Sequence, residues 1–286
     1  MHYPVMLGEA LAYLAIRPDG VYLDATAGLG GHTRAIAERL TTGFVIAADR
    51  DAESLERAKQ NTADLADRIR FIHSPFSRLA VAISSLGVKG VNGLLADLGV
   101  SRYQLTDAER GFSLMHEGPL DMRMDRSQET SAADIVNFTA EKALADLIYR
   151  LGEERRARRI ARAIVRSRPI RSTAHLAQVI ETAVPRTGRL HPATLTFMAL
   201  RLAVNEEQGE LDALLEAAPR MLVSGGRAVL ISFMSLEDRK VKQAIQAWRR
   251  DGIASVLTRH VITPSEQELE ENPASRSAKL RAAEKL

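Results

Sequence analysis

The segment from residue 21 to residue 33, Val-Tyr-Leu-Asp-Ala-Thr-Ala-Gly-Leu-Gly-Gly-His-Thr, constrains the fold more than any other part of the chain. A short apolar run of high β propensity ends at Asp24, and a loop containing Gly28, Gly30 and Gly31 leads into a helical pattern. A strand, a glycine-rich turn and a helix N-terminus form the cradle that nucleotide-like ligands occupy in open α/β sheets. Glycines alone are common in such turns, so this segment needs support from elsewhere in the chain.

Two further acids at strand ends supply that support. Residues 45–49, Val-Ile-Ala-Ala-Asp, predict the next strand, and Asp49 follows the glycines by about 20 residues, where these folds place an acid for ribose hydroxyls. Residues 91–97 predict another strand that ends at Asp97. Because ligands bind at the carboxyl ends of parallel strands, we expect Asp24, Asp49 and Asp97 to border one site.

The glycine spacing favours one of two cofactor classes. Dinucleotide sites use G-x-G-x-x-G, whereas this chain has G-x-G-G, with Thr33 at the third glycine position. Asp24 lies just before the loop, where its charge opposes a pyrophosphate but suits the cationic methionine end of S-adenosylmethionine (SAM). The balance favours SAM, and a dinucleotide oxidoreductase is the weaker alternative.

The absence of cysteine limits the chemistry. The chain has 286 residues and no cysteine, so it has no disulfide and no thiolate metal site. Methylation at a pyrimidine carbon commonly needs a cysteine that adds to the ring, so a methylated base is expected to react at nitrogen or oxygen. No metal site is indicated by ligand spacing, although a Mg²⁺ held by carboxylates stays open. With no secretory signal and no apolar run of about 18 residues, we expect a cytoplasmic enzyme without membrane contact.

The order of periodic segments predicts an interrupted α/β domain. Alternating strand and helix patterns place it at residues 1–101 and 207–286, with an all-helical substrate-recognition insertion at 102–206. Loops are expected at 98–104, 110–113 and 118–125, a turn at Gly225-Gly226 and a last strand at 277–282. The segment 264–273, with four glutamates, is expected to be solvated or partly disordered.

Basic charge is concentrated in the insertion. Residues 101–205 carry 17 Lys and Arg against 12 Asp and Glu, and the rest of the chain carries 22 against 24. The densest part is 152–166, whose arginines at 155, 159, 162 and 166 share one helical face. That face either follows the phosphates of a polyanion or is a solvated surface paired with Glu153 and Glu154.

Two other motifs have ordinary structural interpretations. Ser235 and Asp238, at the start of a helix after a strand, predict a capping pair. His191-Pro-Ala-Thr194 predicts a turn and a helix start. For His32, which follows the glycine pair, a cofactor contact and a structural role are about equally expected.

Together, the motifs of the chain resemble one family, the MraW-type small-subunit ribosomal RNA (cytosine-N4) methyltransferases. The resemblance covers nearly the whole chain in the same order, and its most specific motifs are Gly118–Asp125 and His191–Thr194. The motifs are His2-Tyr-Pro-Val, Asp24–His32, Asp49-Arg-Asp51, Asp97–Ser101, Glu109–Ser113, Gly118–Asp125, Gly152–Arg155, His191–Thr194 and Ser235–Arg239.

The resemblance implies a class I SAM-dependent methyltransferase fold, Rossmann-like with a mostly parallel sheet, and a helical insertion. It implies methylation of the exocyclic N4 of a cytidine in the decoding centre of small-subunit ribosomal RNA. The partner would be ribosomal RNA or the small ribosomal subunit, and a homodimer is left open. Carried across by motif, the cofactor-binding residues would be Gly30, Gly31 and His32 at the methionine end, Asp49 at the ribose, Phe76 near the adenine, and Asp97 and Gln104 completing the pocket.

For the reaction itself, a carboxylate that accepts an N–H of the cytosine amine would raise electron density on nitrogen and stabilise the developing positive charge. Asp97 is the candidate catalytic residue, with Asp121 and Asp125 as alternatives.

Three segments depart from the family pattern. The family usually has Ser-Ser-Pro-Gln where this chain has Ser101-Arg-Tyr-Gln104, Thr-Phe-Gln where it has Thr196-Phe-Met198, and Ser-Phe-His-Ser where it has Ser232-Phe-Met-Ser235. Methionine cannot donate a hydrogen bond or carry a proton as histidine can. Met198 and Met234 therefore motivate an alternative function, a SAM-binding ribosome-assembly factor with weak or no catalysis.

Overall fold

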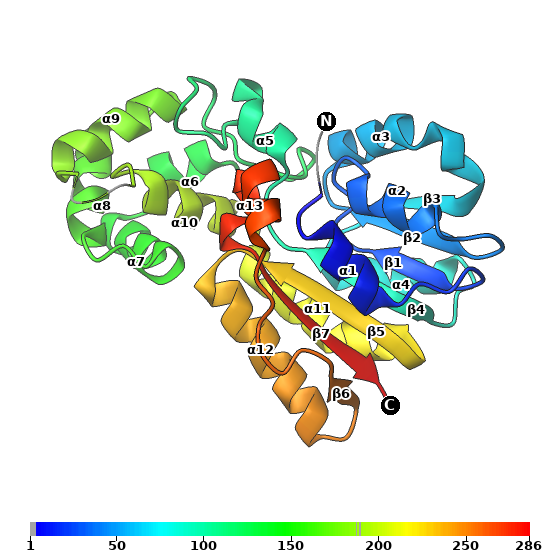
Figure 1. Ribbon diagram of the computed structural model, residues 1–286. Coiled ribbons are helices and arrows are strands. Elements are labelled where there is room, and N and C mark those ends of the chain that lie inside the picture. The colour runs from blue at the N-terminus through cyan, green and yellow to red at the C-terminus, as the bar shows by residue number, and fades with distance from the viewer. Residues whose placement is uncertain (1–3, 187, 189) are drawn as a thin grey trace. The chain divides into compact units, whose positions relative to one another are not determined.

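The protein divides into two compact units. The computed structural model describes residues 4–186, 188 and 190–286, so His2 and Tyr3 of the first motif lie outside the described residues. One unit is α/β and comprises Met1–Gly99 with Gln208–Leu286, and the other is helical and comprises Val100–Glu207 (Figure 1). The sequence analysis placed these boundaries at 101/102 and 206/207.

A seven-stranded sheet forms the centre of the α/β unit. Its spatial order is β3-β2-β1-β4-β5-β7-β6, with β1 to β5 parallel and β7 antiparallel to both β5 and β6. Figure 1 shows β7 in red between β5 and β6. The strands are β1 (Val21–Asp24), β2 (Phe44–Asp49), β3 (Ile69–His73), β4 (Val91–Asp97), β5 (Leu222–Ser232), β6 (Ala254–Val256) and β7 (Lys279–Lys285).

The alternation of side chains along the strands builds a core on each face of the sheet. Leu23 and Ile46 belong to one buried cluster with residues of α4, α11 and α12, whereas Tyr22 and Val45 belong to the other with residues of α1, α2 and α3. Successive strand residues point to opposite faces, so both faces of a parallel sheet must be apolar and covered by helices. This sheet confirms the predicted α/β class and the mostly parallel arrangement.

The helices of this unit agree with the predicted pattern except near the C-terminus. They are α1 (Leu7–Leu14), α2 (Gly31–Ala37), α3 (Ala52–Asn61), α4 (Leu79–Ser85), α11 (Glu207–Met221), α12 (Ser235–Arg250) and α13 (Glu266–Glu271), with 3-10 turns η1 (Ala63–Arg68), η2 (Phe76–Arg78) and η4 (Pro273–Ser277). The segment 264–273 is solvent-exposed along most of its length, as expected, but it is not disordered, because α13 forms there. Ser265 caps α13 by accepting from Glu268 N, and Glu268 in turn accepts a hydrogen bond from Met6 N.

The turn predicted at Gly225-Gly226 lies inside a strand, β5. β5 runs from Leu222 to Ser232, and its pairing with β4 shifts register between Val91 and Gly93. Gly225 has φ 74° inside this irregularity, a conformation that favours glycine. The local geometry of a turn is therefore present, but the strand continues through it.

Glu237 caps α12, so the predicted Ser235–Asp238 capping pair was wrong. Its carboxylate accepts from the backbone N–H groups of Phe233 and Met234 at 3.0 and 3.2 Å. Asp238 instead accepts two hydrogen bonds from Arg281 on β7. The N-cap of α12 is Met234 and not Ser235, so the third helical position is occupied by Glu237 and not by Asp238.

The helical unit has its own apolar core and, over its described residues, no strand. Its helices are α5 (Arg102–Thr106), α6 (Ala132–Phe138), α7 (Glu141–Gly152), α8 (Ala157–Arg166), α9 (Thr173–Ala183) and α10 (Thr194–Val204), with the 3-10 turn η3 (Ala108–Arg110). The expectation of an uninterrupted loop at 98–104 was wrong, because α5 begins at Arg102. Ser101 and Gln104 form the capping box that starts it.

Candidate active site

The glycine loop between β1 and α2 adopts a backbone conformation in which residues other than glycine would be strained. Gly30 is the N-cap of α2 with φ 88°. At Gly31, a Cβ would lie 2.7 Å from Cγ of Pro4, so the N-terminal segment packs directly on the loop. The loop therefore keeps its backbone close to neighbouring groups, as a cradle for a small ligand requires.

Asp24, at the end of β1, holds the loop to the first turn of α2. It is fully buried and accepts hydrogen bonds from Thr33 Oγ1 at 2.6 Å and from Thr26 N at 3.2 Å. Burial raises the pKa of Asp24 to about 6, and these hydrogen bonds counteract part of the rise. Thr33, which replaces the third glycine of a dinucleotide fingerprint, is thus the donor that satisfies this acid.

Asp49, at the end of β2, holds the other side of the loop. Its two oxygens accept from Gly28 N at 2.8 Å and from Asp51 N at 2.9 Å. Burial raises the pKa of Asp49 to about 6, against the effect of these hydrogen bonds and with a contribution from the charges of Asp51 and Asp24. Each carboxylate oxygen has a second lone pair, so Asp49 retains capacity for ligand hydroxyls.

Asp97, at the end of β4, differs from Asp24 and Asp49 in that one of its oxygens accepts no hydrogen bond. Its Oδ1 is buried and has no hydrogen-bond partner, while its backbone N–H donates to Thr26 Oγ1 at 2.7 Å. Burial, and then the charges of Asp24 and Glu237, raise the pKa of Asp97 to about 8. A buried acceptor without a partner is unfavourable unless a ligand donates to it, so this oxygen marks a binding position.

His32, in the first turn of α2, lies beside Asp97. Its Nδ1 is 3.9 Å from Asp97 Oδ2, and its Nε2 is 3.1 Å from the carbonyl oxygen of Val5. The side chain is almost fully buried. The structure therefore brings His32 and Asp97 together, and the N-terminal segment holds the ring from the other side.

Phe76 follows β3 next to Asp49. Ser74 N donates to the carbonyl oxygen of Asp49 at 2.9 Å, which fixes the turn that leads to Phe76. The ring is partly buried against the core that contains residues of α4 and α11. Phe76 thus lies in the same unit as the glycine loop and the three strand-end acids.

Gln104 is the predicted cofactor residue that the structure does not place with the others. It belongs to the helical unit, and its Oε1 accepts from Ser101 N at 3.0 Å in the capping box of α5. The pattern Ser-x-x-Gln is a recognised capping signal, which the sequence analysis did not use. A cofactor contact by Gln104 stays a prediction.

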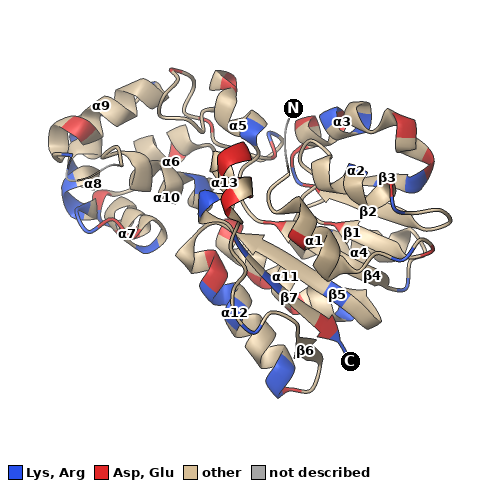
Figure 2. Ribbon diagram, viewed as in Figure 1, with Lys and Arg blue, Asp and Glu red and all other residues tan. Residues whose placement is uncertain are grey.

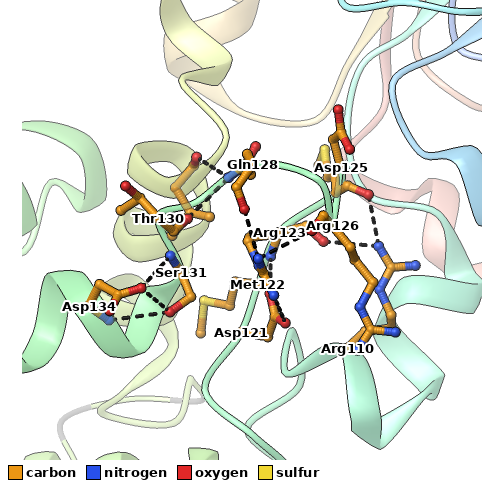
Figure 3. Close-up of polar contacts among 12 residues, drawn as sticks. Arg110, Asp121, Met122, Arg123, Asp125, Arg126, Gln128, Thr130, Ser131 and Asp134 are labelled. Atoms are coloured by element: carbon orange, nitrogen blue, oxygen red, sulfur yellow. Dashed lines mark hydrogen bonds and ion pairs between the residues drawn. The ribbon is translucent and has the colours of Figure 1, made fainter.

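The alternative acids Asp121 and Asp125 are engaged within their own loop (Figure 3). Asp121 accepts from Arg123 Nε at 2.8 Å and Nη2 at 2.9 Å. Burial works to raise the pKa of Asp121, but the hydrogen bonds and charge of Arg123 outweigh it and hold the pKa below its usual value. Asp125 accepts from the backbone N–H and hydroxyl of Ser127. Both acids therefore shape the loop.

A buried arginine anchors the same loop. Arg110 Nη2 donates to the carbonyl oxygens of Arg123 and Met124, both at 3.0 Å. Asn205 clamps the loop from the other side, accepting from Met124 N and donating to the carbonyl oxygen of Met122. The octapeptide Gly118–Asp125 is thus a hydrogen-bonded scaffold of the helical unit (Figure 3).

His191 has a structural role in the helical unit. Its Nδ1 accepts from Ala193 N at 3.1 Å, and its Nε2 lies 3.2 Å from Glu181. The imidazole therefore helps to start α10, as the turn interpretation predicted.

Sequence reasoning missed three groups that shape the site. Thr26 supports Asp97, the carbonyl of Val5 holds His32, and Glu237 adds a charge that raises the pKa of Asp97. Only Glu237 had a local signal in the sequence: a glutamate at the third position of a helix is typical of a capping box, and Glu237 has this position because the N-cap is Met234. The other two contacts join distant parts of the chain and have no periodic signature.

Within the described ranges, no three His, Asp or Glu side chains are grouped so that they could hold a metal ion. None of the helices in that part of the chain is long and apolar enough to cross a membrane.

The geometry fits an S-adenosyl group. The glycine loop gives backbone access beside Asp49, and Asp97 offers a buried acceptor that lacks a donor. A parallel sheet whose carboxyl edge carries this cradle, extended by an antiparallel β7 between β5 and β6, is the class I fold of SAM-dependent methyltransferases.

The chain belongs to the MraW methylase family, which it matches over residues 1–286. It is therefore a methyltransferase, and its methyl donor is SAM. It is 65% identical to a protein named Ribosomal RNA small subunit methyltransferase H from Solibacter usitatus, over 99% of each chain. Proteins of the same name from Acidobacterium capsulatum and Nostoc punctiforme are 50% and 48% identical, over 99% and 100% of this chain and 98% and 94% of theirs. The family resemblance predicted from the motifs is thereby confirmed.

Proposed function

We propose that this protein transfers the methyl group of SAM to the exocyclic N4 of a cytidine in small-subunit ribosomal RNA, in the decoding centre. The observation that carries the proposal is Asp97, a carboxyl group at the end of β4 with one buried oxygen that lacks a donor. Relatives that match along their full length are named as small-subunit ribosomal RNA methyltransferases, which supports the choice of substrate. The absence of cysteine supports a nitrogen target over a ring carbon.

The proposed cofactor site uses the cradle described above. Gly30, Gly31 and His32 hold the methionine end, Asp49 accepts from the ribose hydroxyls, and Phe76 lies against the adenine. Asp49 suits this role because each of its oxygens retains a lone pair after accepting one backbone N–H. When bound, SAM supplies an electrophilic methyl group.

Asp97 is the proposed catalytic residue. The lone pair of the cytosine amine is delocalised into the ring, and a carboxylate that accepts one N–H returns electron density to the nitrogen. As the N–CH₃ bond forms, N4 loses this proton, and Asp97 accepts it. A carboxyl group whose pKa is raised to about 8 is a stronger base than an ordinary aspartate. It would take up the proton once the positive charge of bound SAM has shifted it to the ionised form.

His32 has a proposed positioning role toward Asp97. With its Nε2 next to the carbonyl of Val5 and its Nδ1 3.9 Å from Asp97, the imidazole limits the rotation of the carboxyl group. The N-terminal segment therefore contributes to the site through its backbone.

Methyl transfer to small subunits tests the proposal directly. SAM with a labelled methyl group is incubated with small subunits that lack the modification, and the labelled nucleoside is identified after digestion. We expect label at N4 of a cytidine. Label at a ring carbon or at a ribose, with none at N4, would overturn the proposal.

A second candidate function is a SAM-binding ribosome-assembly factor with little catalysis. It is motivated by Met198 and Met234, which stand where the family usually has glutamine and histidine. This function predicts tight binding of SAM and RNA without turnover. Met234→His discriminates between the two. A wild-type protein that turns over only after histidine is restored at 234 favours the assembly factor, and a wild-type protein that is already active, with a rate that Met234→His leaves unchanged, favours the enzyme.

A further inference from the structure

Two groups of arginines in the helical unit differ in their contacts. The first group is bound within the fold: it donates to carboxylates or to backbone carbonyls and holds loops in place. Its members are Arg110, Arg123, Arg156, Arg168 and Arg201.

The second group lies on α8 and faces solvent. The side chains of Arg158, Arg159 and Arg166 are exposed and make no hydrogen bond or ion pair with any part of the chain that the structure describes. Arg162 is also exposed and meets Glu141 of α7 at 3.5 Å, in a pair that is open to water on both sides. Such exposed pairs are worth little, so Arg162 remains available to a stronger partner.

These four arginines occupy one face of the helix. At about 100° per residue, their directions fall within an arc of about 100°. The buried side of α8, marked by Ile160 and Ile164, lies opposite this arc. From Arg158 to Arg166 the face extends for about 12 Å at about 1.5 Å per residue. Figure 2 shows this concentration of basic residues along α8. We refer to residues 158, 159, 162 and 166 as the arginine face.

The chemistry of the face matches a phosphate backbone. Guanidinium groups bind phosphate oxygens with two parallel N–H donors, and a row of them fits a chain that carries one negative charge per nucleotide. The alternative sequence interpretation, a solvated face paired with Glu153 and Glu154, was wrong for Glu154, which is buried and paired with Arg156. The arginine face thus lacks the internal carboxylates that would neutralise it, apart from Glu141.

We propose that the arginine face binds the phosphate backbone of the substrate RNA, independently of base sequence. The proposal rests on the proposed function, in which RNA is the substrate. It assigns binding of the RNA backbone to residues other than those that bind the cofactor. Phosphate contacts position a nucleic acid and carry no sequence information, so the arginine face should contribute to RNA affinity and not to the choice of base.

The test compares two triple variants with equal loss of charge. The first is Arg158→Gln, Arg159→Gln and Arg166→Gln, and the matched control is Arg239→Gln, Lys242→Gln and Arg249→Gln, three exposed residues of α12. The Kd for protein-free small-subunit ribosomal RNA is measured against KCl concentration. Each lost phosphate contact lowers the slope of log K against log salt by about 0.7, so we expect a decrease of about 2 in the slope and about 100-fold weaker binding at 0.1 M salt.

The control variant should retain most of the wild-type slope, and Glu141→Gln, which frees Arg162, should strengthen binding a few-fold. Methylation by the first variant should show a raised KM for RNA with little change in kcat, and SAM binding and the circular dichroism spectrum should be unchanged.

An unchanged slope in the first variant overturns the proposal, as does an equal loss in the control. A loss that appears only with assembled subunits and not with free RNA also overturns it, because the partner would then be a ribosomal protein. Should wild-type protein fail to methylate N4, the proposed function fails, while the salt slopes still decide the RNA-binding proposal.

Discussion

Replacing Asp97 with asparagine is expected to stabilise the ligand-free protein while it removes the proposed catalytic group. The carboxyl group lies at the end of β4 with one oxygen buried and without a donor, and its pKa is raised to about 8. In the unfolded chain the same group ionises near pH 3.8. Between these two values the folded protein holds a proton that the unfolded chain does not, so its stability falls as pH rises.

The size of the effect follows from the two pKa values. One pKa unit corresponds to about 1.4 kcal/mol, so at pH 7 the buried carboxyl lowers the free energy of unfolding by at most about 4 kcal/mol. The side chain keeps 22% of its surface exposed, and solvent screening reduces this to about 2–4 kcal/mol. Asparagine has nearly the same shape as aspartate and does not ionise, so Asp97→Asn should recover most of this lost free energy of unfolding. For a unit of this size that corresponds to a rise in Tm of at least about 4 °C.

The assay is thermal unfolding of ligand-free wild type and Asp97→Asn at pH 5 and at pH 8. We expect the advantage of the variant to be small at pH 5 and to grow toward pH 8. Asp238→Asn is the control, because Asp238 is satisfied by two hydrogen bonds from Arg281 and its loss should destabilise. Equal or lower Tm for Asp97→Asn at pH 8, or a difference that does not change with pH, would refute the reasoning.

Single-turnover rates complete this prediction. Loss of a positioned proton acceptor commonly lowers a rate by about 100-fold or more. Asp97→Asn should therefore be the more stable and the less active protein at saturating SAM. An unchanged rate would remove Asp97 from the chemistry while leaving the stability argument intact.

Three further substitutions test the supports of the site and of the helical unit. Thr33→Val removes the 2.6 Å hydrogen bond to Asp24 and should lower the free energy of unfolding by about 1–3 kcal/mol in urea titrations above pH 6. Gly31→Ala places a Cβ 2.7 Å from Pro4, so the glycine loop or the N-terminal segment must shift and the SAM affinity measured by calorimetry should fall. Normal SAM affinity would show that the loop does not need this close approach. Arg110→Met leaves two loop carbonyls without their donor and should destabilise the helical unit by about 2–4 kcal/mol, visible as faster hydrogen exchange within 118–125.

Periodicity predicted the part of the fold that carries the site. Strands that end at Asp24, Asp49 and Asp97 were expected to meet at one sheet edge, and the bonds from Gly28 N to Asp49 and from Asp97 N to Thr26 confirm it. A buried parallel sheet imposes apolar strands and places their carboxyl ends together, so this inference needs only local patterns.

The elements that sequence reasoning missed are short or depend on distant contacts. α5 has five residues, too few for a helical period, and α13 is a solvated, glutamate-rich helix with no buried residue, so it has no apolar period that could predict it. The contact of Glu268 with Met6 N joins residues 262 positions apart, which no local pattern can indicate. The same limit applies to the pairing of His32 with the carbonyl of Val5.

The raised pKa values at the sheet edge link SAM binding to pH. Burial raises the pKa values of Asp24 and Asp49 to about 6 and that of Asp97 to about 8, and the charges of neighbouring acids add to the rise at Asp49 and Asp97. In the free protein, Asp97 therefore holds its proton at neutral pH, and all three acids hold theirs below pH 6. A cationic ligand favours the ionised form, so binding SAM should release protons below pH 8, and SAM affinity should rise as pH increases from 6 to 8. S-adenosylhomocysteine lacks the sulfonium charge and should show a smaller dependence. Calorimetry in buffers of different ionisation enthalpy measures the protons released, and an equal release for the two ligands would show that the acids do not respond to the sulfonium.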